Sequence, residues 1–173
     1  MPIFQCPECG QTLAERTASC PYCGFPLTSL PDPNAPEVTI SNDSCFYFKD
    51  GKMTLLSTNQ GTVFLSSRRI AFFKFSAGQK FLLGGMTQFF AEGKVPVLEL
   101  NLTDIYSIHV EKQQMNKRLL IVTMKDSGRH GFFITSKSGF SQKSEEWMDL
   151  ITKAIIQYLG RTPRVENGIF YFI

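Results

Sequence analysis

The sequence lacks a long apolar run. No window approaches the roughly 20 apolar residues that a membrane-spanning helix needs, and the most apolar stretch, 81–91, is interrupted by glycines and polar residues. The first residues lack a basic segment followed by an apolar core, so we expect no secretory signal. We therefore expect a cytoplasmic location, where reduced thiols favour metal binding over disulfides.

Charged residues and catalytic side chains are also scarce. Only 19% of the residues are charged and the formal net charge is +3, which is too small to indicate a nucleic-acid partner. The two histidines, His109 and His130, have no Ser, Cys or carboxylate at a spacing typical of a catalytic group. Gly84-Gly85 lacks the Lys-Ser/Thr that follows in a phosphate-binding loop. We therefore expect no enzymatic activity and no catalytic residues.

The sequence does contain a cluster of cysteines near its start. Four of the five cysteines lie between residues 6 and 23, in two copies of one pattern. The copies are Cys6-Pro7-Glu8-Cys9-Gly10 and Cys20-Pro21-Tyr22-Cys23-Gly24. Two residues between cysteines let both thiolates of a pair face one tetrahedral ion. We therefore predict that Cys6, Cys9, Cys20 and Cys23 bind one structural Zn²⁺ ion.

The residues around the cysteines support a closed metal site. Proline fixes one torsion of each turn, and Gly10 and Gly24 permit the positive φ that brings backbone N–H groups toward the sulfurs. Four protein ligands leave no open coordination position, so the ion is expected to be structural. Iron also accepts four thiolates, so the ligand set alone leaves zinc and iron open. A redox Cys-x-x-Cys would need only one pair, in a βαβ context.

The paired motif resembles the short zinc ribbons found at the start of many bacterial and archaeal proteins. Ten residues separate the pairs, fewer than in the usual four-cysteine pattern, which indicates a minimal ribbon of two knuckles and one hairpin. A segment this short cannot bury enough apolar surface to fold unaided. We therefore expect metal binding to supply the free energy of folding, and a strong chelator to unfold the ribbon.

Three parts are expected along the chain. Residues 1–27 form the zinc ribbon, residues 28–36 form a linker with three prolines, and residues 37–173 form a β-domain. The linker has no periodic apolar pattern and is predicted to be a semi-rigid spacer. The 16 phenylalanines fall mostly in short runs that alternate with polar residues, which favours β-structure over a helical bundle.

The β-domain is predicted to hold seven short strands, typical of a barrel or a sandwich. They are Met53–Thr58, Thr62–Ser66, Ile70–Phe75, Val97–Leu102, Tyr106–Glu111, Arg118–Met124 and Gly131–Thr135. Cys45–Phe48 is a candidate edge strand, and Gly168–Ile173 is expected to form a terminal strand or a packed tail. Turn-rich breaks separate the runs, among them Asn59-Gln60-Gly61 and Asp126-Ser127-Gly128.

The periodicity changes to that of a helix near the end of the chain. Within Ser144–Leu159, apolar residues recur three and four positions apart, as on one face of an amphipathic helix. Ser144 or Ser141 is predicted to cap its start and Gly160 to end it. One such helix would close an open end of the barrel and bury the single tryptophan, Trp147.

The order of these motifs resembles the GRAM family. Residues 61–73, Gly-Thr-Val-Phe-Leu-Ser-Ser-Arg-Arg-Ile-Ala-Phe-Phe, look like the GRAM strand, Thr/Ser–Arg turn and aromatic strand. Residues 97–108 resemble the later strands, and 117–124, Phe132-Phe133 and the Glu146-Trp147 helix continue the order. GRAM domains have the pleckstrin-homology-like fold. The resemblance therefore implies an α+β domain, a seven-stranded antiparallel and partly open barrel capped by a C-terminal helix.

Pleckstrin-homology-like domains often bind phosphoinositides or protein segments, so the resemblance implies a ligand of this kind. In that family, basic residues in the first hairpin loop usually hold lipid phosphates. The loop expected here, Ser57–Gly61, has no Lys or Arg to donate to a phosphate. Arg68 and Arg69 are candidate partner or membrane contacts elsewhere; the alternative is an ordinary solvated rim.

The segment Ser76–Lys94 is unusually long for a connection within a compact domain. Its large apolar side chains would be costly to leave in water, and they are predicted to contact a partner protein, a membrane or another copy of the chain. These residues are Phe81, Leu82, Leu83, Met86, Phe89 and Phe90. The alternative is a short helix packed on the barrel. Replacing Phe89 and Phe90 with serine separates the two, because unfolding without changed association removes the binding hypothesis.

Together these features predict a non-catalytic, zinc-binding adaptor. Its GRAM-like domain would bind a protein partner or a membrane lipid surface, the latter at the inner face of the membrane. The alternative is a nucleic-acid-associated zinc-ribbon protein. Against it, Arg16 is the ribbon's one basic residue, and Glu8 and Glu15 oppose it. No affinity for generic DNA, even at low salt, would eliminate this alternative.

Overall fold

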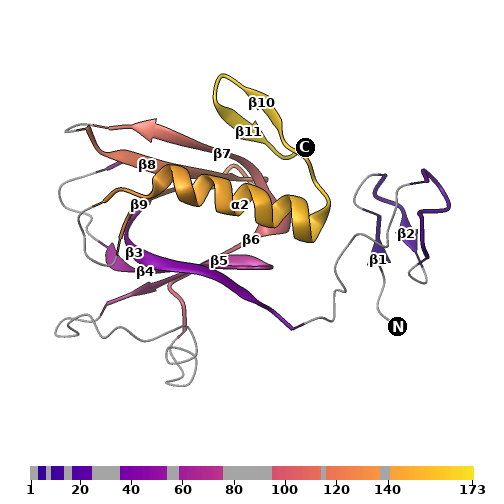
Figure 1. Ribbon diagram of the computed structural model, residues 1–173, viewed down its shortest axis with the longest axis horizontal. Coiled ribbons are helices and arrows are strands. Elements are labelled where there is room, and N and C mark those ends of the chain that lie inside the picture. The colour runs from indigo at the N-terminus through magenta and orange to yellow at the C-terminus, as the bar shows by residue number, and fades with distance from the viewer. Residues whose placement is uncertain are drawn as a thin grey trace.

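The computed structural model describes residues 4–6, 9–13, 17–24, 36–53, 59–75, 95–113, 116–136 and 141–173. These residues form a small β-sheet, a large β-sheet and the α-helix α2 (Figure 1). The small sheet pairs β1 (Phe4–Gln5) with β2 (Thr12–Leu13) in the cysteine-rich segment. No helix in the described ranges is long and apolar enough to span a membrane.

The large sheet has nine antiparallel strands. They are β3 (Thr39–Lys49), β4 (Asn59–Ser66), β5 (Arg69–Lys74), β6 (Leu98–Asn101), β7 (Ile105–Lys112), β8 (Arg118–Met124), β9 (Arg129–Thr135), β10 (Arg164–Glu166) and β11 (Ile169–Tyr171). Their order across the sheet is β10-β11-β7-β8-β9-β3-β4-β5-β6. A 3-10 turn, η1 (Leu102–Asp104), joins β6 to β7.

The number of strands corrects the prediction of seven. Six of the predicted strands correspond to β4–β9, but the described residues place nine strands in the sheet. One addition is β3, which pairs with both β4 and β9, so Cys45–Phe48 is central and its prediction as an edge strand is wrong. The other addition is the C-terminal hairpin β10–β11, which extends the sheet beyond β7. A short apolar run does not reveal how many neighbours a strand will have.

The start of β4 also differs from the prediction. Asn59-Gln60-Gly61 is not a turn but the first part of β4. The connection from β3 to β4 is therefore residues 50–58, which begins at Asp50 and Gly51, both with positive φ. Residues 54–58, the greater part of the predicted strand Met53–Thr58, lie outside the described residues.

The helix α2 spans Ser144–Leu159, as predicted. Gly160 ends it with a left-handed φ of 66°, and the Gly160 N–H donates to the carbonyl of Ile156 at 3.0 Å. The predicted serine cap is wrong. The N-cap residue is Lys143, and Ser144 Oγ instead donates to the carbonyl of Arg118 in β8 at 2.6 Å. This hydrogen bond fixes the start of the helix to the sheet.

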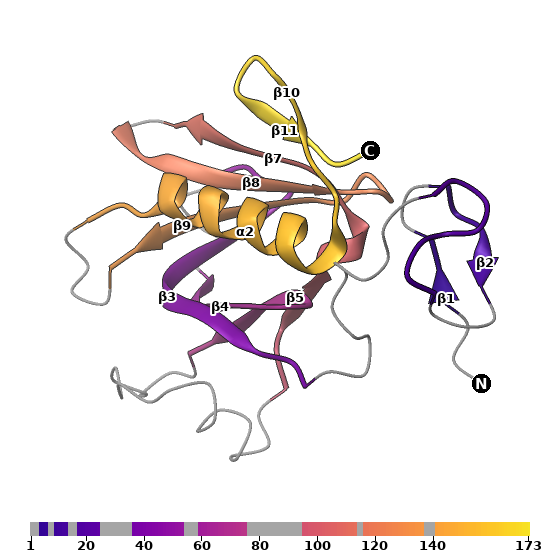
Figure 2. The same ribbon diagram turned by 45° about the vertical axis from the view of Figure 1, so that its right-hand side comes forward.

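The helix covers one side of the curved sheet, where it packs on β7, β8 and β9 (Figure 2). Trp147 is fully buried in the core between them, which confirms its prediction. Its indole N–H donates to Oδ2 of Asp43 in β3 at 3.0 Å, and Lys143 Nζ donates to the same oxygen at 3.2 Å. Asp43 is only 4% exposed. The paired carboxylate therefore joins the long strand β3 to the start of α2 inside the core.

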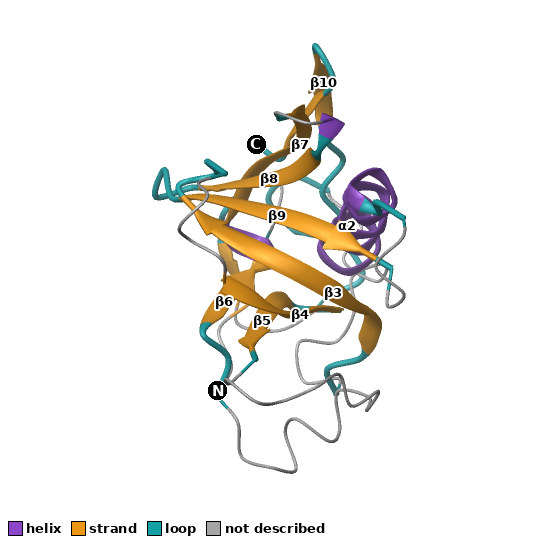
Figure 3. Ribbon diagram, turned by 90° about the vertical axis from the view of Figure 1, so that its left-hand side faces the viewer, coloured by secondary structure: helices purple, strands orange, loops and turns teal. Residues whose placement is uncertain are grey.

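The strands β3, β8 and β9 are apolar on both faces. Tyr47 and Phe132 belong to the main core, whereas Phe48 and Ile121 belong to a separate buried cluster. Because successive side chains of a strand point to opposite faces, the two clusters lie on the two sides of the sheet. Figure 3 shows α2 beside these strands on one side of the sheet. This arrangement explains why β8 has a continuous apolar run rather than an alternating one.

Candidate metal centre and docking surfaces

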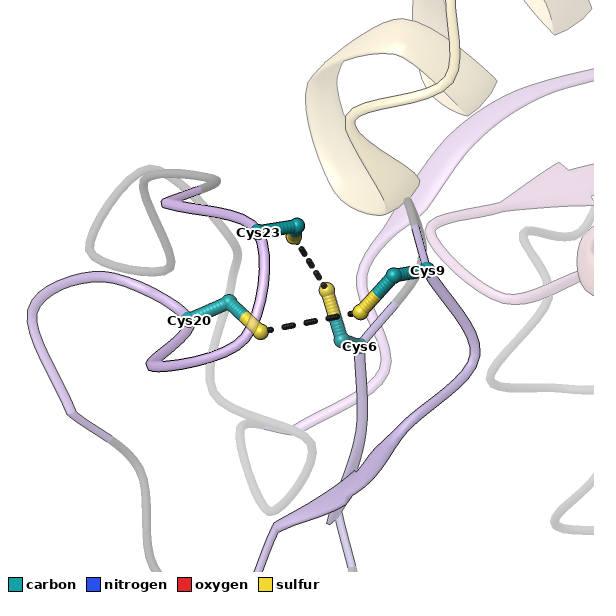
Figure 4. A group of neighbouring side chains, drawn as sticks. All are labelled: Cys6, Cys9, Cys20 and Cys23. Atoms are coloured by element: carbon teal, nitrogen blue, oxygen red, sulfur yellow. Dashed lines mark hydrogen bonds between the residues drawn. The ribbon is translucent and has the colours of Figure 1, made fainter.

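The four predicted metal ligands converge on one point. The sulfurs of Cys6, Cys9, Cys20 and Cys23 all lie within 4.8 Å of one another (Figure 4). Two distances cross between the pairs, Cys6 Sγ to Cys23 Sγ and Cys9 Sγ to Cys20 Sγ, and each is 3.7 Å. Four sulfurs bound to a tetrahedral ion at about 2.3 Å are about 3.8 Å apart. The thiols therefore stand near ligand spacing, and the four cysteines could hold a metal ion.

Two backbone turns of the same kind present the thiols. Gly10 and Gly24 have φ values of 71° and 76°, so the predicted positive φ is confirmed. Each glycine N–H donates at 2.8 Å to the carbonyl of the first cysteine of its pair, Cys6 or Cys20. These first cysteines are buried and the second ones are exposed. The cage thus has an inner side and a side that faces solvent.

Hydrogen bonds favour the thiolate at one ligand. Burial opposes ionisation of Cys20, but the backbone N–H groups of Tyr22 and Cys23, together with two neighbouring thiols, lower its pKa to about 7. At Cys9 the Gln11 backbone hydrogen bond lowers the pKa, but burial and two thiols outweigh it, and the pKa is raised. The pKa values of the Cys20 and Cys9 thiols are therefore shifted in opposite directions. A bound cation would favour the thiolate at both.

Arg69, a predicted partner or membrane contact, is engaged by acidic residues. Its guanidinium donates to both carboxylate oxygens of Glu37 at 3.0 Å and to Glu99 at 2.7 Å. Ser66 Oγ also donates to Glu37. The two carboxylates offset the charge of Arg69 and occupy three of its five N–H donors, which disfavours phosphate binding there. Arg68, in the adjoining turn between β4 and β5, is exposed.

The other predicted contacts cannot be placed. Phe81, Leu82, Leu83, Met86, Phe89 and Phe90 lie outside the described residues. Their role as a binding segment stays a prediction.

Three exposed lysines at one end of the large sheet were missed by the sequence reasoning. Lys49 ends β3 opposite His130 of β9, Lys52 follows in the turn after β3, and Lys125 lies in the turn that precedes β9. The pairing of Lys49 with His130 places both turns at the same end of the sheet. We call Lys49, Lys52 and Lys125 the lysine rim. The first hairpin loop was predicted at Ser57–Gly61, beyond Lys49 and Lys52, and no local pattern joins these two residues to Lys125.

Comparisons with known proteins find solved structures of similar fold, but no matching family model or curated protein. Among solved structures, the Vps36 N-terminal PH domain is 18% identical, with a TM-score of 0.49, and covers 82% of this chain and 92% of that one. The Slm1 PH domain in complex with D-myo-inositol-4-phosphate is 16% identical, with a TM-score of 0.41, and covers 68% and 97%.

A third structure is the PH domain of human oxysterol-binding protein-related protein 11. It is 8% identical, with a TM-score of 0.43, and covers 79% of this chain and 97% of that one. The antiparallel strands β3–β9 followed by α2 have the arrangement implied by a pleckstrin-homology-like fold. These identities and TM-scores are too low to carry a function from the neighbours to this chain.

Proposed function

We propose that this chain is a non-catalytic zinc-binding adaptor, in which a zinc ribbon is joined to a GRAM-type β-domain that docks on a membrane surface or a protein. The observation that carries the proposal is the four-thiol cage. Four thiolates complete the coordination shell of zinc and leave no position for water or substrate. The ion would therefore stabilise the ribbon rather than catalyse a reaction. Because the ligands must stay reduced, a cytoplasmic location is part of the proposal.

Elemental analysis of the purified chain tests the metal site. We expect one zinc per chain in protein prepared without oxidant or chelator. Cys20→Ser should lower the zinc content well below one, because three thiolates bind the ion less tightly. Cys45→Ala is the matched control, since Cys45 is buried in the β-domain core away from the cage. Metal well below one per chain in protein whose ribbon remains folded would contradict the proposal.

The lysine rim supports an anionic membrane as the docking surface of the β-domain. Three exposed ammonium groups at one end of the sheet would each gain about 1 kcal/mol beside an anionic leaflet. Asp50 and Asp126 lie in the same two turns, so the attraction is moderate and depends on salt. Two lysines of the rim lie at the first hairpin, Lys49 at the end of β3 and Lys52 in the connection to β4, where the pleckstrin-homology resemblance places its basic residues.

Vesicle flotation tests this docking surface. We expect the chain to float with phosphatidylcholine vesicles that contain an anionic lipid, and not with phosphatidylcholine alone. Lys49→Glu with Lys52→Glu should weaken the partition at least about tenfold, because two charges are reversed near the surface. Lys153→Glu, on the exposed side of α2, is the control. Equal loss in the control and the rim variant would contradict a docking role for the rim.

A further inference from the structure

The strands β10 and β11 form a β-hairpin after α2. They are joined by Asn167-Gly168, whose φ values of 50° and 77° are both positive. This is the two-residue turn that suits antiparallel strands, so the hairpin's register is set locally. A short connection after Gly160, containing Pro163, links it to α2. A two-stranded hairpin is marginally stable on its own and depends on what it packs against.

The hairpin is attached to the edge of β7 over a short length. Phe170 is opposite Ile108 and Tyr171 is opposite Ser107, and the Phe172 N–H donates to the carbonyl of Tyr106 at 2.8 Å. In an antiparallel ladder every second residue points its backbone groups to the same side. Tyr106 and Ile108 face the tail in this way, and the next residues of β7 on that side are Val110 and Lys112. In the described part of the chain, no strand pairs with them on this side.

Two aromatic side chains at alternate positions anchor the attachment. Phe172 is fully buried in the main core, and Phe170 packs against the same core two residues earlier. Tyr171 lies between them and meets Tyr106 edge-on, with ring centroids 5.8 Å apart. The Arg161 guanidinium donates to the carbonyl of Phe172. The tail therefore enters as an extended strand with two aromatic anchors at alternate positions.

We propose that the β7 edge, with the core position filled by Phe172, is a docking site for an extended segment of a partner protein that carries aromatic residues at alternate positions. The chain's own tail is the resident occupant, and the partner displaces it. The tail itself shows which chemistry the site accepts. Val110 and Lys112 pair with β8 on one side, but on the side of β11 no strand among the described residues pairs with them, so a longer strand gains hydrogen bonds that the hairpin cannot make. The inference rests on the proposed binding role and names the partner chemistry.

The test uses the full chain with Phe172→Ala, which empties the anchor position while keeping the rest of the tail. A labelled peptide of residues 162–173 is added in trans and followed by fluorescence anisotropy. We expect it to bind this variant at least tenfold more tightly than the wild-type chain, whose own Phe172 competes. The same peptide carrying Phe172→Ala is the control and should lose at least tenfold in affinity.

A second peptide tests the unpaired part of the edge. It carries Asn167→Thr and Gly168→Val, so that it stays extended alongside Val110 and Lys112 instead of turning away. We expect it to bind more tightly than the native peptide. A tail with a purely structural role predicts no such gain.

Several outcomes overturn the proposal. They are equal affinity of the two peptides, no binding by a variant that still unfolds cooperatively, and failure of the Phe172→Ala chain to fold, which would make the tail a fixed part of the core. A doubled mass in light scattering would show that the site takes the tail of a second copy. Zinc content and flotation do not involve this edge, so failure here is distinguishable from failure of the proposed function.

Discussion

Gly61 is the residue at which close packing most clearly dictates the amino acid. It lies in β4 opposite Lys74 of β5. A Cβ at this position would stand 2.0 Å from the carbonyl oxygen of Phe73 and 2.8 Å from the ring of Phe72. Neither neighbour can move freely, because one is backbone and the other is fully buried. The glycine therefore serves a close approach of strand and side chain.

We predict that Gly61→Ala lowers the free energy of unfolding by about 3 kcal/mol, because the added methyl overpacks the sheet. Thermal or urea unfolding measures the change. Gly168→Ala is the control, since nothing lies within 4 Å of its Cβ position and only its positive φ is strained, at about 1 kcal/mol. Equal losses in the two variants would show that the close approach at Gly61 is absent.

Both histidines have environments that oppose protonation. Burial lowers the pKa of His109, and the nearby Arg129 guanidinium lowers it further, against the opposite effect of Glu111. Burial also lowers the pKa of His130, whose Nδ1 lies 3.0 Å from the hydroxyl of Tyr47. A depressed folded-state pKa means that the unfolded chain binds more protons near pH 6.5. Folding stability is then complete above that pH and decreases as the pH falls through it.

We therefore predict that the free energy of unfolding decreases between about pH 7.5 and about pH 5.5, a range in which carboxylates stay ionised. The double variant His109→Gln and His130→Gln should flatten this dependence. Urea unfolding at several pH values measures it. An unchanged pH dependence in the double variant would assign the effect to other groups.

At the scale of elements, the ribbon and the helix show how local sequence determines local structure. In the cysteine-rich segment, two copies of the pattern Cys-Pro-x-Cys-Gly give two turns with similar glycine φ values and the same backbone hydrogen bond. In α2, the apolar period and Gly160 fix both the extent and the end of the helix. In the described part of the ribbon, β1 and β2 pair over only two residues each. Its stability should therefore depend on the metal.

We predict that a strong chelator unfolds the ribbon and leaves the β-domain folded. The ribbon amides should lose their dispersion in NMR spectra, while the thermal transition of the β-domain stays within a few degrees of its starting value. Zinc added back should restore the ribbon signals. Loss of the β-domain transition on chelation would mean that the two parts fold as one unit.

At the scale of the whole molecule, candidate functional surfaces arise from segments far apart in the chain. The lysine rim joins the turn after β3 to the turn before β9, which are separated by more than half of the domain's strands. At the β7 edge, β7 pairs with β11, which lies near the end of the sequence. Neither arrangement has a local signature. Each exists because antiparallel pairing brings the two segments together.

The sequence by itself determined which four cysteines come together in a cluster that could hold a metal ion, the helix and its end, and the existence of most strands. These depend on residues a few positions apart, where spacing, periodicity and the conformational freedom of glycine act directly. The serine cap was predicted on the same local grounds and was wrong, because Ser144 is the first residue of the helix and its hydroxyl donates to the carbonyl of Arg118 in a distant strand.

Only the tertiary structure decided that β3 is central, that Asn59–Gly61 belongs to a strand and that the terminal hairpin extends the sheet. The alternation of apolar residues indicates that a segment is a strand, but it does not indicate which strands pair with it. The neighbours are set by hydrogen bonds and packing between segments distant in sequence, and these form only when the whole domain closes.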